Sequence, residues 1–85
     1  MIVVLLAGTV AEAVQYAKDA GLARKNTITA GSPQVLEGLR LADEDLIVQF
    51  PTFMARRDSS DIIDVLLQGI TLGGTKPRWE RVGKT

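Results

Sequence analysis

The stretch IVVLLAGTVAEAV, residues 2–14, decides the fold that the sequence predicts. Its first part, residues 2–7, is a continuous aliphatic run, which is typical of a strand buried on both faces of a parallel sheet. Thr9 and Glu12 have the spacing of a capping box, in which a hydroxyl and a carboxylate each accept a hydrogen bond from a free backbone N–H group. A strand that turns at Gly8 into a capped helix is the repeating unit of doubly wound α/β sheets.

The same unit recurs along the chain. Residues 26–30 predict a short second strand, and Ser32 followed by Pro33 predicts the start of a short helix that reaches Leu39. Residues 46–50 predict a third strand. The clearest apolar helical stripe comes next, and it consists of Ile62, Ile63, Leu66, Leu67 and Ile70.

Right-handed crossovers place the first strand in the middle of the sheet. We therefore expect an α/β fold, a minimal three-layer (βα)3 Rossmann-like domain, with a three-stranded parallel sheet in the order 2-1-3. This single domain is expected to span residues 1–72. Residues 73–85, which are rich in glycine and basic side chains, are expected to form a tail or a docked extra strand.

The composition restricts the possible chemistry. The chain has 85 residues, with 10 Lys and Arg against 10 Asp and Glu, and it contains neither His nor Cys. Histidine-based triads, thiol nucleophiles and the usual zinc sites are therefore excluded. We predict that the protein is not an enzyme and expect no catalytic residue, no metal site and no cofactor.

The apolar run at residues 2–7 is too short for a secretory signal and has no basic residue before it. It is also far shorter than the roughly 20 apolar residues of a membrane span. We therefore expect a cytoplasmic protein that does not associate with membranes.

The turn at Gly8 and Thr9 could hold an anion at the start of the first helix, with Arg56 and Arg57 as additional donors. The Walker A and dinucleotide motifs need further glycines at fixed positions after Gly8, and the Walker A motif also needs a lysine. This turn has neither. Glu12 also places a negative charge in the first helical turn, where it would repel a phosphate. A nucleotide- or phosphate-binding site made of these four residues is therefore an alternative hypothesis.

The loop after the third strand, PTFMARR at residues 51–57, ends beside the point where the winding of the sheet reverses. It offers an apolar anchor, a flexible side chain and two forked donors for a partner protein, namely Phe53, Met54, Arg56 and Arg57. The alternative is that Phe53 packs into the edge of the core while the arginines pair with Asp58 and Asp61.

The segment KPRWERVGK, residues 76–84, places basic residues around Trp79, a pattern that can bind single-stranded nucleic acid. One aromatic residue is little support for such a site. We rather expect Trp79 to cover a bare sheet face, so nucleic acid is the weaker alternative as a partner. The acidic residues 43–45 are expected to form a solvated turn.

In the order 2-1-3, only one helix lies on the first face of the sheet. The strand at 46–50 appears in sequence as buried on both faces, yet one of its faces has no helix to cover it. The C-terminal segment or a second subunit must then cover it, and we expect a homodimer.

Several features match one class of proteins in the same order along the chain: a strand that ends at Gly8 and Thr9, EAVQYAKDAGL at 12–22, SPQVLEGLR at 32–40, and LIVQFPTFMARRDSSDIIDVL at 46–66. With these features the chain resembles small uncharacterised α/β proteins of actinobacterial tailed phages, mycobacteriophages above all. The resemblance implies a phage origin, expression in the host cytoplasm and a role in modulating host processes, but it carries over no catalytic residue. We therefore expect a non-enzymatic interaction protein that acts on a host protein.

Overall fold

A computed structural model describes residues 1–82 of the chain. Its elements are, in order, β1 (Val3–Leu6), α1 (Val10–Ala20), η1 (Arg24–Asn26), β2 (Thr27–Thr29), α2 (Pro33–Leu36), β3 (Leu46–Gln49), η2 (Pro51–Ala55), α3 (Ser59–Gly73) and β4 (Arg78–Arg81). The two η elements are short 3-10 helices.

The strands form one parallel sheet in the order β2-β1-β3-β4. As predicted, β1 lies between β2 and β3, with Val4 opposite Ile28 on one side and opposite Ile47 on the other. The expected α/β class and parallel sheet are confirmed. The prediction of three strands is wrong, because β4 pairs with β3 and places Trp79 opposite Ile47.

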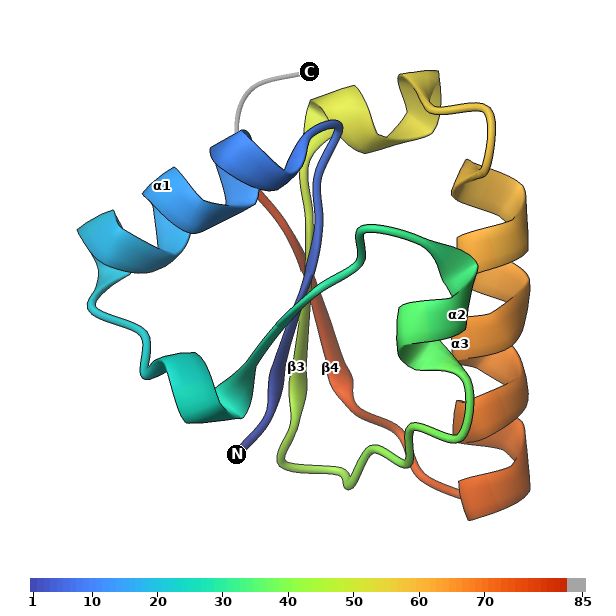
Figure 1. Cartoon of the computed structure of the whole chain (residues 1–85). Helices are drawn as coiled ribbons and strands as arrows, with labels where there is room; N and C mark the ends of the chain where they lie inside the picture. The colour runs from blue at the N-terminus through green and yellow to red at the C-terminus, as the bar shows by residue number, and fades with distance from the viewer. Residues whose placement is uncertain (83–85) are drawn as a thin grey trace.

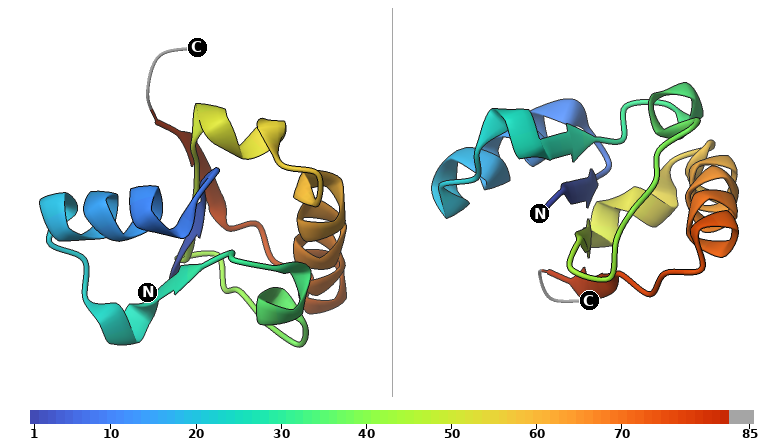
Figure 2. Two further views of the ribbon diagram at one scale, coloured as in Figure 1. Left: turned by 45° about the horizontal axis from the view of Figure 1, so that its top comes forward. Right: turned by 90° about the horizontal axis from the view of Figure 1, so that it is seen from below.

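The helices cover opposite faces of the sheet. Helix α1 lies on one face, whereas α2 and α3 lie together on the other (Figures 1 and 2). The core accordingly has two parts. On the α2 and α3 side, Val4, Leu6 and Ile47 pack with Phe53 and Ile62.

On the α1 side, Leu5 and Val48 pack with Ala13, Phe50 and Tyr16. The Tyr16 ring meets the Phe50 ring edge to face, with centroids 5.1 Å apart and planes at 84°. Val82 packs against the same cluster. The face of β3 that was expected to lack a cover is thus covered within one chain, so this reason for a homodimer is lost.

Helix α1 begins at the predicted cap and ends at a glycine. The Thr9 hydroxyl accepts a hydrogen bond from the Glu12 amide at 3.2 Å. Gly21 adopts φ 68°, and its backbone N–H caps the final carbonyls of the helix.

Helix α2 is shorter than expected. Pro33 is its first residue, but Ser32 makes no capping hydrogen bond through its side chain. The helix ends at Leu36, and Gly38 follows at φ 76°, so Leu39 lies beyond it.

Strand β4 was hard to recognise because all four of its residues are exposed, without the apolar pattern of the inner strands. Two contacts hold the connection from α3. The Thr75 hydroxyl donates to the Leu41 carbonyl at 2.7 Å, and the Lys76 amide donates to Asp43 Oδ1 at 2.7 Å. These contacts fix the chain beside the loop that precedes β3, and from there β4 runs parallel to β3.

Asp45 is buried, so the prediction that residues 43–45 form a solvated turn is wrong for this residue. Its carboxylate accepts the Ile2 amide at 2.7 Å and the Ala42 amide at 2.7 Å. Asp45 thereby joins the start of β1 to the loop before β3.

Replacing Asp45 by Ala should therefore destabilise the fold, because the amides of Ile2 and Ala42 would lose their acceptor. We expect Asp45→Ala to lower the free energy of unfolding by about 1–3 kcal/mol. The neighbouring exposed control, Glu44→Ala, should change it by no more than about 0.5 kcal/mol. Urea unfolding of both variants provides the measurement, and equal effects would contradict the role given to Asp45.

Candidate functional site

The carboxyl end of the sheet between β1 and β3 is the candidate site, because the direction of winding reverses there. The turn after β1 and the η2 helix after β3 lie side by side, as the strand order predicts. The Gly8 amide donates to Thr52 Oγ1 at 3.1 Å. A Cβ atom on Gly8 would stand 2.7 Å from the Thr52 Cβ. The glycine is therefore required by the close approach of the chain's own η2 helix.

The position that an anion would take at the start of α1 is filled by Glu12. Its Oε1 atom accepts the Gly8 amide at 3.3 Å and also accepts a hydrogen bond from the Thr52 hydroxyl. The carboxylate complements the positive end of the α1 dipole. The Gly8 amide and the Thr9 hydroxyl are thus engaged by residues of the chain itself.

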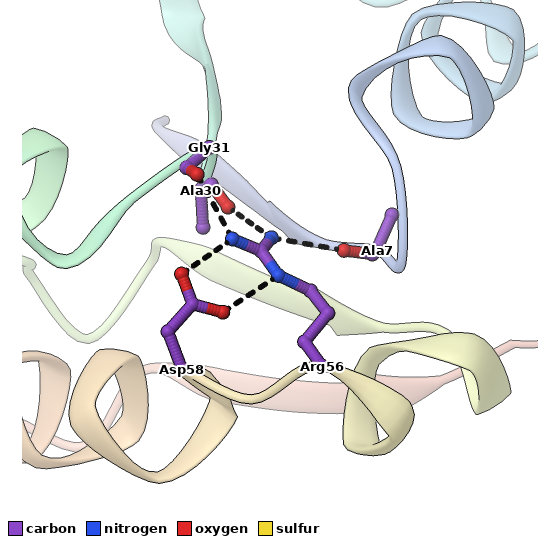
Figure 3. Close-up of polar contacts among 5 residues, drawn as sticks. All are labelled: Ala7, Ala30, Gly31, Arg56 and Asp58. Atoms are coloured by element: carbon purple, nitrogen blue, oxygen red, sulfur yellow. Dashed lines mark hydrogen bonds and ion pairs between the residues drawn. The ribbon is translucent and has the colours of Figure 1, made fainter.

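Arg56 occupies the same end of the sheet, and all five of its guanidinium N–H groups have acceptors (Figure 3). Nη1 donates to the Ala7 carbonyl at 3.1 Å and to the Ala30 carbonyl at 2.6 Å. Nη2 donates to the Gly31 carbonyl at 2.9 Å. The remaining two groups form a fork on the Asp58 carboxylate, at 2.9 Å from Nε and 2.8 Å from Nη2.

These contacts connect three parts of the fold. Ala7 follows β1, Ala30 and Gly31 follow β2, and Asp58 precedes α3. The Arg56 side chain is only 16% exposed. An incoming phosphate would have to displace hydrogen bonds that hold the strand ends together.

Asp58 binds Arg56 instead of capping α3. It is the N-cap residue of α3, but its side chain makes no capping hydrogen bond, because both carboxylate oxygens bind Arg56. The alternative sequence interpretation, in which Arg56 pairs with Asp58, is confirmed. Within residues 1–82, no ion pair joins Arg57 to Asp61.

Phe53 is fully buried in the core on the α2 and α3 side. The prediction that Phe53 is an exposed anchor is therefore wrong. It failed because η2 coils the loop and turns this side chain inward, where it lies beneath the Arg56 guanidinium at 6.0 Å. Of the four predicted contact residues, Met54 at 58% exposure and Arg57 remain accessible.

Trp79 lies on β4, where its indole Nε1 donates to Gln49 Oε1 at 2.9 Å. Its side chain is 37% exposed, and Arg78 and Arg81 beside it are exposed as well. Lys84, which belongs to the same predicted basic segment, lies outside the described residues.

One hollow of about 520 Å³ lies between α1 and β2, away from the reversal point, and it is lined by Val14, Ala17, Lys18, Leu22, Arg24, Thr27 and Thr29. In residues 1–82, no group of three or more Asp or Glu side chains is arranged to hold a metal ion. None of the helices in this part of the chain is both long and apolar enough to cross a membrane.

Sequence reasoning missed Thr52, and it gave the ion pair of Arg56 with Asp58 only as an alternative. The spacing of Arg56 and Asp58, two positions apart just before a helix, was the available signal for the ion pair. Nothing in the sequence indicated that the carbonyls after two separate strands converge on the same guanidinium.

Removing the Arg56 fork should cost stability, since buried carbonyls and the Asp58 carboxylate would lose their donors. We expect Arg56→Met to lower the free energy of unfolding by about 2–4 kcal/mol. Arg56→Lys should retain only part of the stability, because an ammonium group cannot reproduce the planar fork. The control Arg57→Met, one position away and exposed, should stay within about 0.5 kcal/mol of the wild type. Equal effects of the two Met variants in urea unfolding would refute this role.

Nucleotides should leave the melting temperature unchanged, because Glu12 and Arg56 already fill the place where a phosphate would lie. A ligand at 100 times its Kd would add about 2.7 kcal/mol, which is several degrees for a domain of this size. Thermal melts with ATP, GTP and cyclic nucleotides test this. A melting temperature that rises with nucleotide concentration would favour the anion-binding alternative instead.

Comparisons with known proteins found no matching family model, no matching curated protein and no matching solved structure. The resemblance to phage proteins consequently rests on the sequence features alone.

Proposed function

We propose that this chain is a non-enzymatic interaction protein, encoded by a phage and acting in the cytoplasm of the bacterial host by binding a host protein. On this proposal the sheet is a small doubly wound, Rossmann-like scaffold whose ligand crevice is closed. The phage origin comes from the sequence resemblance. The mode of action is supported by an apolar surface on α3.

This surface, here called the α3 patch, consists of Leu67 and Leu72. Leu67 is 45% exposed and Leu72 is 78% exposed, although both are large aliphatic side chains. The exposure of Leu72 is the observation that carries the proposal. A leucine buried in a complex contributes about 1.5–3 kcal/mol, so a side chain left this open gives a partner much to gain.

Leu72 also lines two hollows. One has a volume of about 300 Å³ and lies between α3 and the segment 36–40. Gly69 lines this hollow and lets α3 approach the segment 36–40 closely, since a Cβ atom on Gly69 would stand 2.6 Å from the Leu39 carbonyl oxygen. The other has a volume of about 540 Å³ and runs along α3 past Leu67.

Polar and charged side chains of both signs surround these hollows. Glu37 and Arg40 line the first, Asp64 lines the second, and Gln68 lines both. An apolar centre with a polar rim is the usual composition of a protein interface. The patch therefore fits an apolar side chain of a partner protein, placed between the two hollows.

The two alternatives have less support. A nucleotide would compete with the internal hydrogen bonds of Glu12 and Arg56. A single-stranded nucleic acid would have only Trp79 to stack on in the basic segment 76–84, whereas such sites usually stack successive bases.

The proposal is tested by affinity capture from host lysate with quantitative mass spectrometry, followed by titration of the captured protein by calorimetry. We expect Leu72→Asp to weaken the binding of that protein at least 10-fold, since a carboxylate would be desolvated in the interface. Val14→Asp introduces the same charge at an exposed valine of α1, on the opposite face, and should bind like the wild type. Melting curves establish that both variants are folded.

Equal binding by Leu72→Asp and Val14→Asp would refute the α3 patch as the contact surface. The proposed function itself would be refuted if no host protein were captured reproducibly by the wild type.

A further inference from the structure

The outer side of β4 is the edge of the sheet (Figure 2). The Arg78 amide donates to the Asp45 carbonyl and the Val82 amide to the Gln49 carbonyl, both toward β3 at 3.0 Å. Backbone groups of successive residues alternate in direction along a strand. The N–H and C=O groups of Trp79 and Arg81 therefore point to the open side, where no strand of residues 1–82 pairs with them.

The side chains of β4 also alternate. Arg78 and Glu80 are paired with Leu46 and Val48 on the α1 side of the sheet, whereas Trp79 is paired with Ile47 on the α2 and α3 side. The sequence Arg78-Trp79-Glu80 is thus a tripeptide with opposite charges on one face and an aromatic residue between them on the other.

We propose that β4 pairs antiparallel with the β4 strand of a second copy of this chain, with Trp79 on the two-fold axis. In this register, Arg78 lies opposite Glu80 of the second copy, and Glu80 lies opposite the second copy's Arg78. The two Trp79 residues exchange backbone hydrogen bonds, since their N–H and C=O groups face outward. The sheets of both copies then continue into each other.

The pairing register follows from charge. Cross-strand pairs of opposite charge stabilise a sheet, and like charges directly opposite destabilise it. Centring the pairing on Glu80 would place two Glu80 carboxylates opposite each other. Centring it on Pro77 would place Arg78 opposite Lys76. Centring it on Arg78 would place the two Arg78 side chains opposite each other.

The dimer should be weak and dependent on concentration. The strand has four residues, and Pro77 just before it has no N–H to donate, so the pairing is short. Pairing two strands this short buries little surface, at the low end of the areas buried between proteins. Pro77 still offers its carbonyl to the Arg81 amide of the second copy.

Charge-reversed variants test both the dimer and its register. Glu80→Arg and Arg78→Glu should each associate about 10-fold or more weakly than the wild type, because each places like charges opposite one another in both pairs. An equimolar mixture of these two variants should form a heterodimer, because all cross-strand pairs then have opposite charges again. Glu44→Arg, an exposed control in the loop before β3, should dimerise like the wild type.

Sedimentation velocity up to high micromolar concentration provides the measurement. The fluorescence of Trp79, the one tryptophan of the sequence, should shift to the blue as the dimer forms. A wild type that stays monomeric would overturn the proposal. It would equally be overturned if both single variants dimerised like the wild type, or if their mixture failed to associate.

Discussion

The Arg56 guanidinium donates five hydrogen bonds at the carboxyl end of the sheet, and these bonds join the ends of β1 and β2 to the start of α3. The carbonyl groups after β1 and β2 have no further ladder partner there, and Ala7 and Ala30 are buried. Leaving such groups without donors would cost stability. One planar guanidinium supplies three of the missing hydrogen bonds, and Asp58 balances its charge. The start of α3 is thereby fixed relative to two strands that are distant in sequence.

This contact also determines which surfaces remain for function. In a doubly wound sheet, the reversal point between β1 and β3 is the usual place of a ligand. Here Arg56 and Glu12, which carry opposite charges, lie at this end of the sheet and bind its turns. Among residues 1–82, every buried side-chain nitrogen or oxygen has a hydrogen-bond partner. The buried polar side chains are therefore satisfied within the chain, whereas the exposed leucines of α3 and the outward backbone groups of β4 are available to a partner.

Local patterns predicted the elements whose signals are local. The aliphatic run of β1 and the Thr9 cap each depend on neighbours within a few residues, and both are confirmed. Asp45 and Phe53 were misjudged, and of the Arg56 contacts only the pairing with Asp58 was predicted, because most of the other partners are distant in sequence. Arg56, for instance, is 49 residues from Ala7. The sequence does not distinguish a tail from a docked strand at residues 73–85, because an exposed edge strand such as β4 has no buried face to impose an apolar pattern.

The two proposed surfaces are linked by symmetry. A two-fold axis through Trp79, perpendicular to the sheet, leaves the helices of both copies on their original sides. The α2 and α3 layers would then lie on the same side of the extended sheet, so a dimer would present two α3 patches in the same direction. A partner that is itself dimeric or repetitive could contact both patches, and its second contact would then be intramolecular. Even a weak dimer would thereby be stabilised by binding, because the partner favours the paired form over two separate chains.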